Sequence, residues 1–314
     1  MIPSAPISFA PWLRPMPWGG FKLATLLSLP ASQERIGEAW LFSDHAQHRS
    51  QISHGVNAGL PLDELISRDA LACLGVDQVQ RFPLLIKILD AKQNLSIQVH
   101  PDDALAVKWS PGEGGKTEAW TVLSAEPGAA IYLGLKPGID LATFQTELAA
   151  GNAPLCLRRY DPQPGETYFI TAGTVHALGQ GVVVLEVQQT SDATFRLYDW
   201  GRVGNDGKPR TLHLEAGLAC TKISPERAGL QQATPERDGS ARLISTPFFT
   251  MKRWENVGEV SIQAPAILLP LNVPITCVDT QSSVPAGQAS LIPAIMGQAR
   301  FSLPVDAVVF EIRW

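Results

Sequence analysis

The segment SIQVHPD, residues 96–102, alternates polar and apolar side chains over its first five positions. In an extended strand successive side chains point to opposite faces, so Ser96, Gln98 and His100 share one face and the two aliphatic residues between them share the other. Taken alone, the polar face is most simply a strip exposed to water, because a lone histidine is seldom a ligand. The pattern predicts a half-buried β-strand. Whether its polar face belongs to a functional site depends on other segments of the chain.

Short apolar runs separated by turn residues continue on both sides of this segment. The chain has 314 residues with 25 prolines and 26 glycines, and runs rich in Val, Ile, Leu and aromatic residues between such residues are typical of β-strands joined by turns. The strand-length segments include 96–100, 121–123, 168–171, 182–188 and 195–200. A doubly wound fold would require helices that alternate regularly with these strands, and the sequence lacks that alternation. We therefore expect a mostly β protein, a jelly-roll β-barrel of the cupin kind.

Helical insertions interrupt the strands at four places. Asp140 can cap a helix that ends before Gly151, where a C-terminal stop belongs. Leu141, Phe144 and Leu148 lie on one face of this helix by their spacing. The other helical segments cover about 61–74, 102–109 and 212–221. We expect all four to pack against the sheets.

The polar stretch 224–240 has no strand periodicity and is predicted to link two domains. The first domain, 1–223, contains every histidine of the chain. The second, 241–314, has further strand candidates at 289–295 and 307–312 and is predicted to be a smaller, structural, cupin-like β-domain.

Charge and composition exclude several classes of partner. The net charge is −5, whereas nucleic acids and anionic membranes call for a broad basic face. The sequence contains no bilayer-length apolar span and no recognisable secretory leader. The four cysteines are widely spaced and are expected to be free thiols in a reducing compartment, which favours the cytoplasm. A small anionic ligand remains possible, and the oligomeric state is not indicated.

Two more segments carry polar residues at the same kind of position. In GKTEAW, residues 115–120, alternation projects Lys116 and Glu118 from one face. In TAGTVHALG, residues 171–179, glycines flank His176 at the end of a strand candidate, as a close approach of backbone to a site requires. Glu118 could instead be a surface carboxylate paired with Lys116, a common arrangement of little energetic value.

Together these segments supply a candidate metal site made of Gln98, His100, Glu118 and His176. Two imidazoles, one carboxylate and one amide oxygen suit zinc, while copper, iron and manganese stay open. Catalysis would require the ion to accept an additional water or substrate oxygen. We expect one zinc ion per chain.

The segments SIQVHPDD, GKTEAW, AGTVHALG and EVQQTSDATFRLYDWGR, in this order, resemble the signature segments of the type I mannose-6-phosphate isomerases, particularly the short bacterial form. The resemblance extends over about 11–223 and is looser beyond. It implies a cupin fold, one zinc ion held by the four residues named above, and interconversion of mannose 6-phosphate and fructose 6-phosphate by proton transfer between C1 and C2 through an enediolate.

The resemblance also implies roles for residues outside the metal site. The basic and phosphate-contacting positions of the family are matched by Ser96, Lys116, Arg196 and Arg202, and its acidic positions by Glu186 and Asp192. We therefore predict Lys116, Glu186, Asp192 and Arg196 as catalytic, and Ser96, Lys116, Arg196 and Arg202 as substrate-binding. Asp192, Glu186, Lys116 and a zinc-bound water all remain candidates for the proton-transferring group.

Two other functions stay open: an isomerase of free aldoses, and a non-catalytic metal-binding cupin that binds a sugar. Several polar residues are expected to have structural roles only. His45, His48 and His54 are expected in a solvated loop, and His213 at a helix end. Arg210 is expected to be solvated, because it follows a turn-forming segment.

Overall fold

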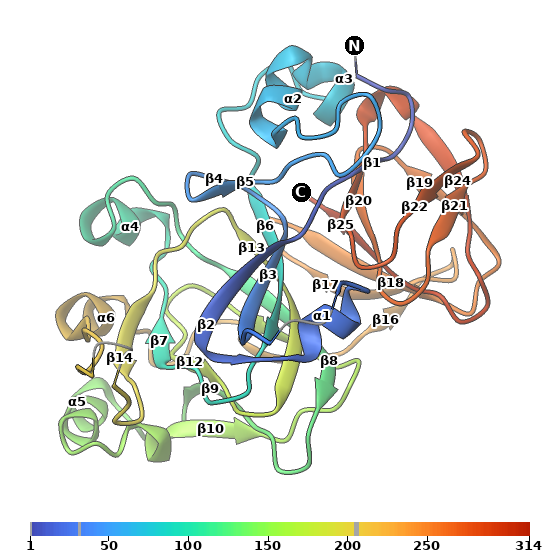
Figure 1. Cartoon of the computed structure of the whole chain (residues 1–314). Helices are drawn as coiled ribbons and strands as arrows, with labels where there is room; N and C mark the ends of the chain where they lie inside the picture. Colours follow the sequence, from blue (N-terminus) through green and yellow to red (C-terminus); the bar gives the residue numbers. More distant parts are fainter. Residues whose placement is uncertain (1, 31–32, 204–206) are drawn as a thin grey trace.

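The computed structural model describes residues 2–30, 33–203 and 207–314. Strands dominate it. Four sheets form two pairs that lie side by side in Figure 1, and β4 (Asp44–His45) and β5 (His48–Arg49) form a separate two-stranded sheet. The expected mostly β cupin fold is confirmed.

The first pair of sheets contains all the signature segments. Its seven-stranded sheet has the order β15 (Gly229–Gln231), β11 (Thr167–Ile170), β8 (Glu118–Ala125), β13 (Val182–Gln189), β6 (Leu84–Asp90), β3 (Ile36–Phe42) and β2 (Trp12–Gly20). Its five-stranded sheet has the order β10 (Leu157–Tyr160), β9 (Ile131–Leu135), β12 (His176–Leu178), β7 (Ile97–Val99) and β14 (Phe195–Tyr198). Buried side chains of both sheets, among them Trp120, Val184 and Leu133, form one apolar cluster, as expected of two sheets packed face to face.

The second pair of sheets is built mainly from the last quarter of the chain. Its seven-stranded sheet has the order β1 (Ile7–Ser8), β23 (Ser290–Ile292), β20 (Ala266–Pro270), β25 (Val308–Arg313), β18 (Thr250–Glu255), β17 (Ala241–Ser245) and β16 (Thr234–Pro235). Its four-stranded sheet has the order β19 (Glu259–Gln263), β24 (Gln298–Ser302), β21 (Ile275–Cys277) and β22 (Ser282–Val284). Apolar side chains such as Phe301 and Val309 fill the space between these two sheets.

The expected helical insertions are present. The helices are α1 (Lys22–Leu26), α2 (Leu62–Arg68), α3 (Ala70–Leu74), α4 (Asp103–Trp109), α5 (Leu141–Ala149), α6 (Leu214–Cys220) and the 3₁₀ turns η1 (Ala153–Cys156) and η2 (Ala294–Met296). Asp140 caps α5 by accepting a 2.7 Å hydrogen bond from the Thr143 backbone N–H. Phe144 and Leu148 of α5 pack with Ile97 and Val99 of β7. Figure 1 accordingly shows α4, α5 and α6 beside the five-stranded sheet.

Side chains alternate between the two faces of β7 and its flanking residues, as predicted. Ile97 and Val99 are fully buried under the helices, and the opposite face turns inward between the sheets. Ser96 and His100 are only 4% and 1% exposed, so the simpler interpretation of this face as a water-exposed strip is wrong.

Residues 224–240 are not entirely loop. They contain β15, which pairs with β11 of the first sheet pair, and β16, which pairs with β17 of the second. The N-terminal strand β1 also pairs with β23 of the second sheet pair. A single large core joins the two seven-stranded sheets and includes Ile86, Met251 and Phe310. The division into domains at 224–240 stays a prediction.

None of the helices in the described ranges is long and apolar enough to cross a bilayer. All four cysteines are free thiols and are buried.

Candidate active site

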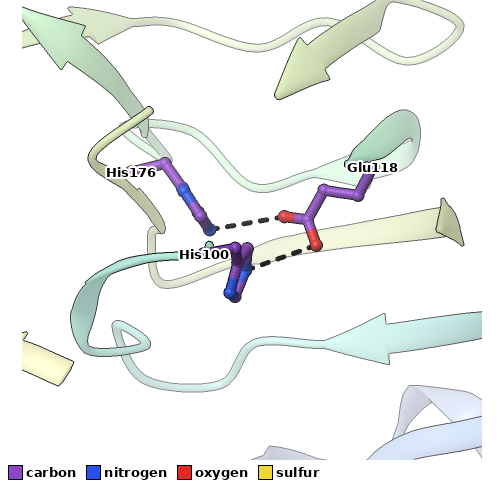
Figure 2. A group of neighbouring side chains, drawn as sticks. All are labelled: His100, Glu118 and His176. Carbon is purple, nitrogen blue, oxygen red and sulfur yellow. Dashed lines mark ion pairs between the residues drawn. The ribbon is translucent and has the colours of Figure 1, made fainter. Parts of the chain in front are cut away.

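Three strands bring the predicted metal ligands together inside the first sheet pair. Antiparallel pairing of β12 with β7 sets His176 directly opposite Gln98. His100 follows β7, and Glu118 begins β8 in the facing sheet. One ligand atom from each of His100, Glu118 and His176 lies within 4.8 Å of the others, and all three side chains are buried. Figure 2 shows the two imidazoles converging on the carboxylate.

The orientation of both imidazoles is set by backbone carbonyls. Nδ1 of His100 donates to the carbonyl of Ala193 at 2.8 Å, and Nδ1 of His176 donates to that of Thr174 at 2.9 Å. Because a carbonyl only accepts, each Nδ1 carries the proton and each Nε2 keeps its lone pair. The two Nε2 atoms lie 3.4 and 3.3 Å from the carboxylate oxygens of Glu118.

The donor set of these three residues suits a metal ion. Oε1 of Glu118 is buried and has no hydrogen-bond partner among the described residues, and an unpartnered buried carboxylate oxygen is costly unless something positive binds it. Two imidazole nitrogens and a carboxylate are common ligands of transition metals. This His–Glu–His group, meaning His100, Glu118 and His176, can therefore hold a metal ion.

Gln98 lies beside the group. Its Nε2 is 3.3 Å from Nε2 of His176, and its Oε1 accepts a 3.3 Å hydrogen bond from the Ser96 hydroxyl. An amide can exchange its oxygen and nitrogen by a half-turn of the side chain. Its role as a fourth ligand stays a prediction.

The electrostatics keep the group ready to bind a cation. Burial, followed by the nearby charge of Lys116, lowers the pKa of His100 to about 4. Burial also lowers the pKa of His176. Burial alone would raise the pKa of Glu118, but the positive charge of Lys116 and the neighbouring His100 hold that pKa well below its usual value. Neutral imidazoles and an ionised carboxylate are the protonation states that metal binding requires.

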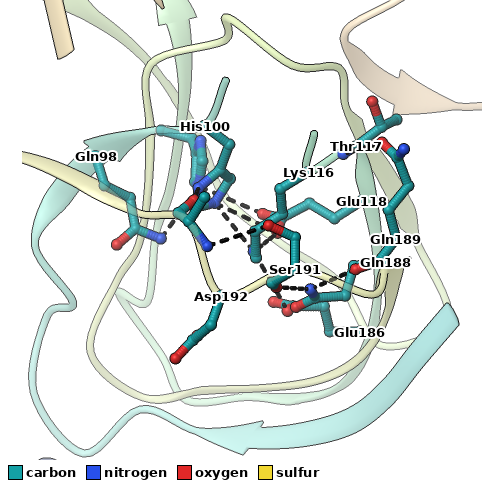
Figure 3. Close-up of polar contacts among 12 residues, drawn as sticks. Gln98, His100, Lys116, Thr117, Glu118, Glu186, Gln188, Gln189, Ser191 and Asp192 are labelled. Carbon is teal, nitrogen blue, oxygen red and sulfur yellow. Dashed lines mark hydrogen bonds and ion pairs between the residues drawn. The ribbon is translucent and has the colours of Figure 1, made fainter. Parts of the chain in front are cut away.

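Lys116 lies at the centre of the polar residues in Figure 3. Its Nζ donates to Glu118, lies 3.1 Å from Nε2 of His100, and is 3.8 Å from Oε1 of Glu186. Its side chain is 4% exposed. The predicted catalytic lysine is thus adjacent to the His–Glu–His group.

Glu186, on β13, is held from two sides. Its Oε2 accepts a 2.7 Å hydrogen bond from the Trp120 indole, and its Oε1 lies 3.0 Å from Nζ of Lys87. Burial alone would lower the pKa of Lys87, but the charge of Glu186 and further carboxylates raise it, so this lysine is charged.

Asp192 belongs to a ring of polar contacts. Its Oδ2 accepts a 2.8 Å hydrogen bond from the Gln47 side chain, and its backbone N–H donates to Glu113 at 3.1 Å. Glu113 in turn lies 3.0 Å from Nε2 of His45. Burial would raise the pKa of Asp192, but the charge of Lys87 and the Gln47 hydrogen bond lower it.

These side chains surround a cavity of about 270 Å³ between the two sheets. The predicted site residues that line it are Ser96, Gln98, Lys116, Glu186, Asp192 and Arg196. Arg14, Lys87 and Arg210 also line it and were not predicted. A larger open depression of about 1010 Å³ beside α2 contains none of the predicted site residues.

The arginines after β13 differ in whether they line the cavity. Arg196 lines the cavity and donates to the carbonyl of Thr211 at 2.9 Å. Arg202 is not among the lining residues and donates to Asp199 at 2.5 Å. Arg210, expected to be solvated, instead lines the cavity and is only 22% exposed. That expectation was wrong because a partner eleven positions away, Asp199, holds its guanidinium.

The expectation of a solvated histidine loop is also wrong for His45. This residue is 2% exposed, whereas His48 stacks on Trp12 with ring centroids 4.5 Å apart. His213 does precede α6, as expected, but its Nδ1 accepts from the backbone N–H of Arg196 at 3.1 Å. These contacts join residues far apart in sequence, so no local signal indicated them.

The family model described as phosphomannose isomerase type I, catalytic domain, matches residues 13–116. A mannose-6-phosphate isomerase of Streptococcus mutans is 37% identical over 257 residues, which cover 82% of this chain and 80% of the relative. The mannose-6-phosphate isomerase ManA of Bacillus subtilis is 36% identical over 273 residues, 84% of each.

Solved structures show the same fold over nearly the whole chain. The crystal structure of a mannose 6-phosphate isomerase from Bacillus subtilis has a TM-score of 0.88 at 29% identity and covers 98% of this chain and 99% of its own. A phosphomannose isomerase from Salmonella typhimurium shares the fold, with a TM-score of 0.79 at 18% identity and 98% coverage of both chains. The chain belongs to the type I mannose-6-phosphate isomerase family and is an enzyme of the isomerase class.

Proposed function

We propose that this enzyme interconverts mannose 6-phosphate and fructose 6-phosphate, with zinc as its metal. The observation that carries the proposal is the buried His–Glu–His group at the edge of a polar cavity that also contains acidic and basic side chains. The substrate is inferred from the relatives, which are named mannose-6-phosphate isomerases.

The proposed zinc ion is held by His100, Glu118, His176 and, as a fourth ligand, Gln98, with one ion per chain. Bound there, zinc would act as a Lewis acid toward the sugar oxygens that become negative as the reaction proceeds. Lys116, whose Nζ lies beside the same group, adds a positive charge at this end of the cavity.

The reaction moves a proton between C1 and C2 through an enediolate of the sugar, so it needs a side chain that takes up the proton and returns it. Glu186 is the least available candidate, because Trp120 and Lys87 already engage its oxygens. Asp192 and Lys116 also line the cavity, and Oδ2 of Asp192 is held by the Gln47 amide. Arg196 and Ser96 line the cavity as well and are proposed to contact the sugar phosphate.

The partner of this protein is accordingly a small sugar phosphate. Cationic side chains concentrated at the cavity allow a protein of net charge −5 to bind an anion. A phosphorylated substrate and four free thiols favour the cytoplasm as its location.

The test compares isomerisation of mannose 6-phosphate and of free mannose by purified protein of measured metal content. We expect turnover of the phosphorylated sugar, its loss on chelation, and its return with added zinc. Activity on free mannose alone would replace the proposal with an aldose isomerase. Binding of metal with activity on neither sugar would contradict catalysis and indicate a sugar-binding cupin.

A further inference from the structure

We propose that Arg210, oriented by Asp199, is the residue that selects phosphorylated over free sugars in this cavity. The inference rests on the proposed function and adds a specificity determinant and its positioning residue to it. Arg210 lies on the wall of the same cavity as Lys116 and Arg196.

Asp199 fixes the direction of the Arg210 guanidinium. Its Oδ2 accepts from Nε of Arg210 at 2.7 Å, and its Oδ1 accepts from Nη2 at 2.6 Å. Two parallel hydrogen bonds to a carboxylate hold a guanidinium in one plane and leave its outer edge to a ligand. Asp199 is 7% exposed, so this support lies within the protein and is little weakened by water.

The cluster formed by Arg196, Asp199, Arg202 and Arg210 carries an excess of positive charge. The carboxylate of Asp199 accepts from two of the three guanidinium groups, those of Arg202 and Arg210, while Arg196 donates to the carbonyl of Thr211. Burial, followed by the charge of Arg210, lowers the pKa of Arg196. Nε of Arg196 is buried without a hydrogen-bond partner among the described residues. A buried unpaired donor beside uncompensated positive charge calls for an anionic ligand.

The sheet places Arg196 of this cluster two strands away from His176 of the His–Glu–His group. His176, Gln98 and Arg196 are register partners across β12, β7 and β14. Neighbouring strands are spaced by about 4.8 Å, so the backbones of His176 and Arg196 lie about 10 Å apart. A sugar whose reacting carbons lie at the His–Glu–His group can thus direct an anionic group at its far end toward Arg196 and Arg210.

The experiment measures kcat/KM for mannose 6-phosphate and for free mannose, together with competitive inhibition by inorganic phosphate. For Arg210→Ala we expect the ratio of the two kcat/KM values to fall about ten- to a hundredfold, because a charge-assisted contact to the phosphate is lost. Inhibition by inorganic phosphate should weaken by a similar factor. Arg237→Ala is the matched control, since it removes an exposed arginine that lines none of the described cavities.

The Asp199→Asn variant distinguishes a positioning role of Asp199 from an effect of its negative charge alone. If Asp199 acted only through its charge, its neutralisation would strengthen phosphate inhibition. We expect the opposite, a several-fold weakening with a rise in KM and little change in kcat, and partial recovery in Asp199→Glu. The effects of Asp199→Asn and Arg210→Ala should be far from additive, because the first acts through the second.

Three outcomes decide the inference. A wild-type enzyme inactive on mannose 6-phosphate would overturn the proposed function and this inference with it. An active wild type whose substrate ratio is unchanged by Arg210→Ala, or is lowered only by Arg202→Ala, would overturn the role of Arg210 alone. If Arg210→Ala does not fold, Arg210→Lys decides, because it keeps the charge but loses the two-point contact with Asp199.

Discussion

Each side chain of the His–Glu–His group has a neighbour that fixes its protonation state. The carbonyls of Ala193 and Thr174 leave both Nε2 atoms unprotonated, and Lys116 keeps Glu118 ionised. Such supporting contacts commonly matter for metal affinity almost as much as the ligands do. The chemistry of this site therefore depends on more than its ligand side chains.

Replacement of Glu118 by glutamine is the sharpest single-residue test of the metal site. Glu118→Gln keeps the size of the side chain but removes the negative charge and one acceptor, so we expect metal affinity to fall about a hundredfold or more and turnover to be abolished. Metal content by elemental analysis and the melting temperature check this. Glu64→Gln, at an exposed helix position, is the control. A variant with full metal occupancy and activity would remove Glu118 from the site.

At the scale of elements, local sequence signals located most of the α-helices of the described ranges but only some of the strands. Asp140 capped α5 as predicted, and β13 and β14 begin where the sequence placed them. These elements have alternation or capping residues within a few positions. The two-residue strands β4 (Asp44–His45) and β5 (His48–Arg49) have no such signal, and this hairpin was expected to be a solvated loop.

His48, in the hairpin of β4 and β5, is expected to make the stability of the protein depend on pH. Burial lowers the pKa of His48, and its Nε2 has no hydrogen-bond partner among the described residues. His48 of the unfolded chain therefore binds a proton near pH 6.5, whereas His48 of the folded protein binds one only at a lower pH. Stability should fall as the pH decreases below about 6.5, and His48→Gln should lessen this fall.

Urea unfolding at pH 7.5 and pH 5 compares wild type, His48→Gln and His54→Gln. His54 is exposed, so its replacement should leave the pH dependence close to that of wild type. An identical pH dependence in wild type and His48→Gln would contradict the explanation.

At the scale of the whole molecule, the two sheet pairs are joined by a common core. Phe310 of β25 is 1% exposed and belongs to the same cluster as Ile86 of β6. The C-terminal sheets therefore support the seven-stranded sheet that carries Glu118 and Glu186. No residue of the His–Glu–His group comes from 224–314.

Phe310→Ala should accordingly destabilise the protein by about 3–5 kcal/mol while the folded variant keeps its metal affinity and its KM for mannose 6-phosphate. Thermal unfolding and metal titration below the transition measure the two properties separately. Val305→Ala, at a position 81% exposed, should change stability by less than about 0.5 kcal/mol. Loss of metal affinity in folded Phe310→Ala would show that the C-terminal sheets help to shape the site.

The sequence by itself determined the fold class, the strand faces and the residues of the His–Glu–His group. It could do so because alternation along one strand decides which side chains share a face, and three short segments each carry one residue of the group. Only the tertiary structure decided that Arg210 and Lys87 line the cavity, that His45 is buried, and that β1 joins the C-terminal sheet. Each of these depends on contacts between separate segments, such as His45 with Glu113, 68 positions apart. Burial and charge pairing arise from packing across the whole chain, which no local pattern encodes.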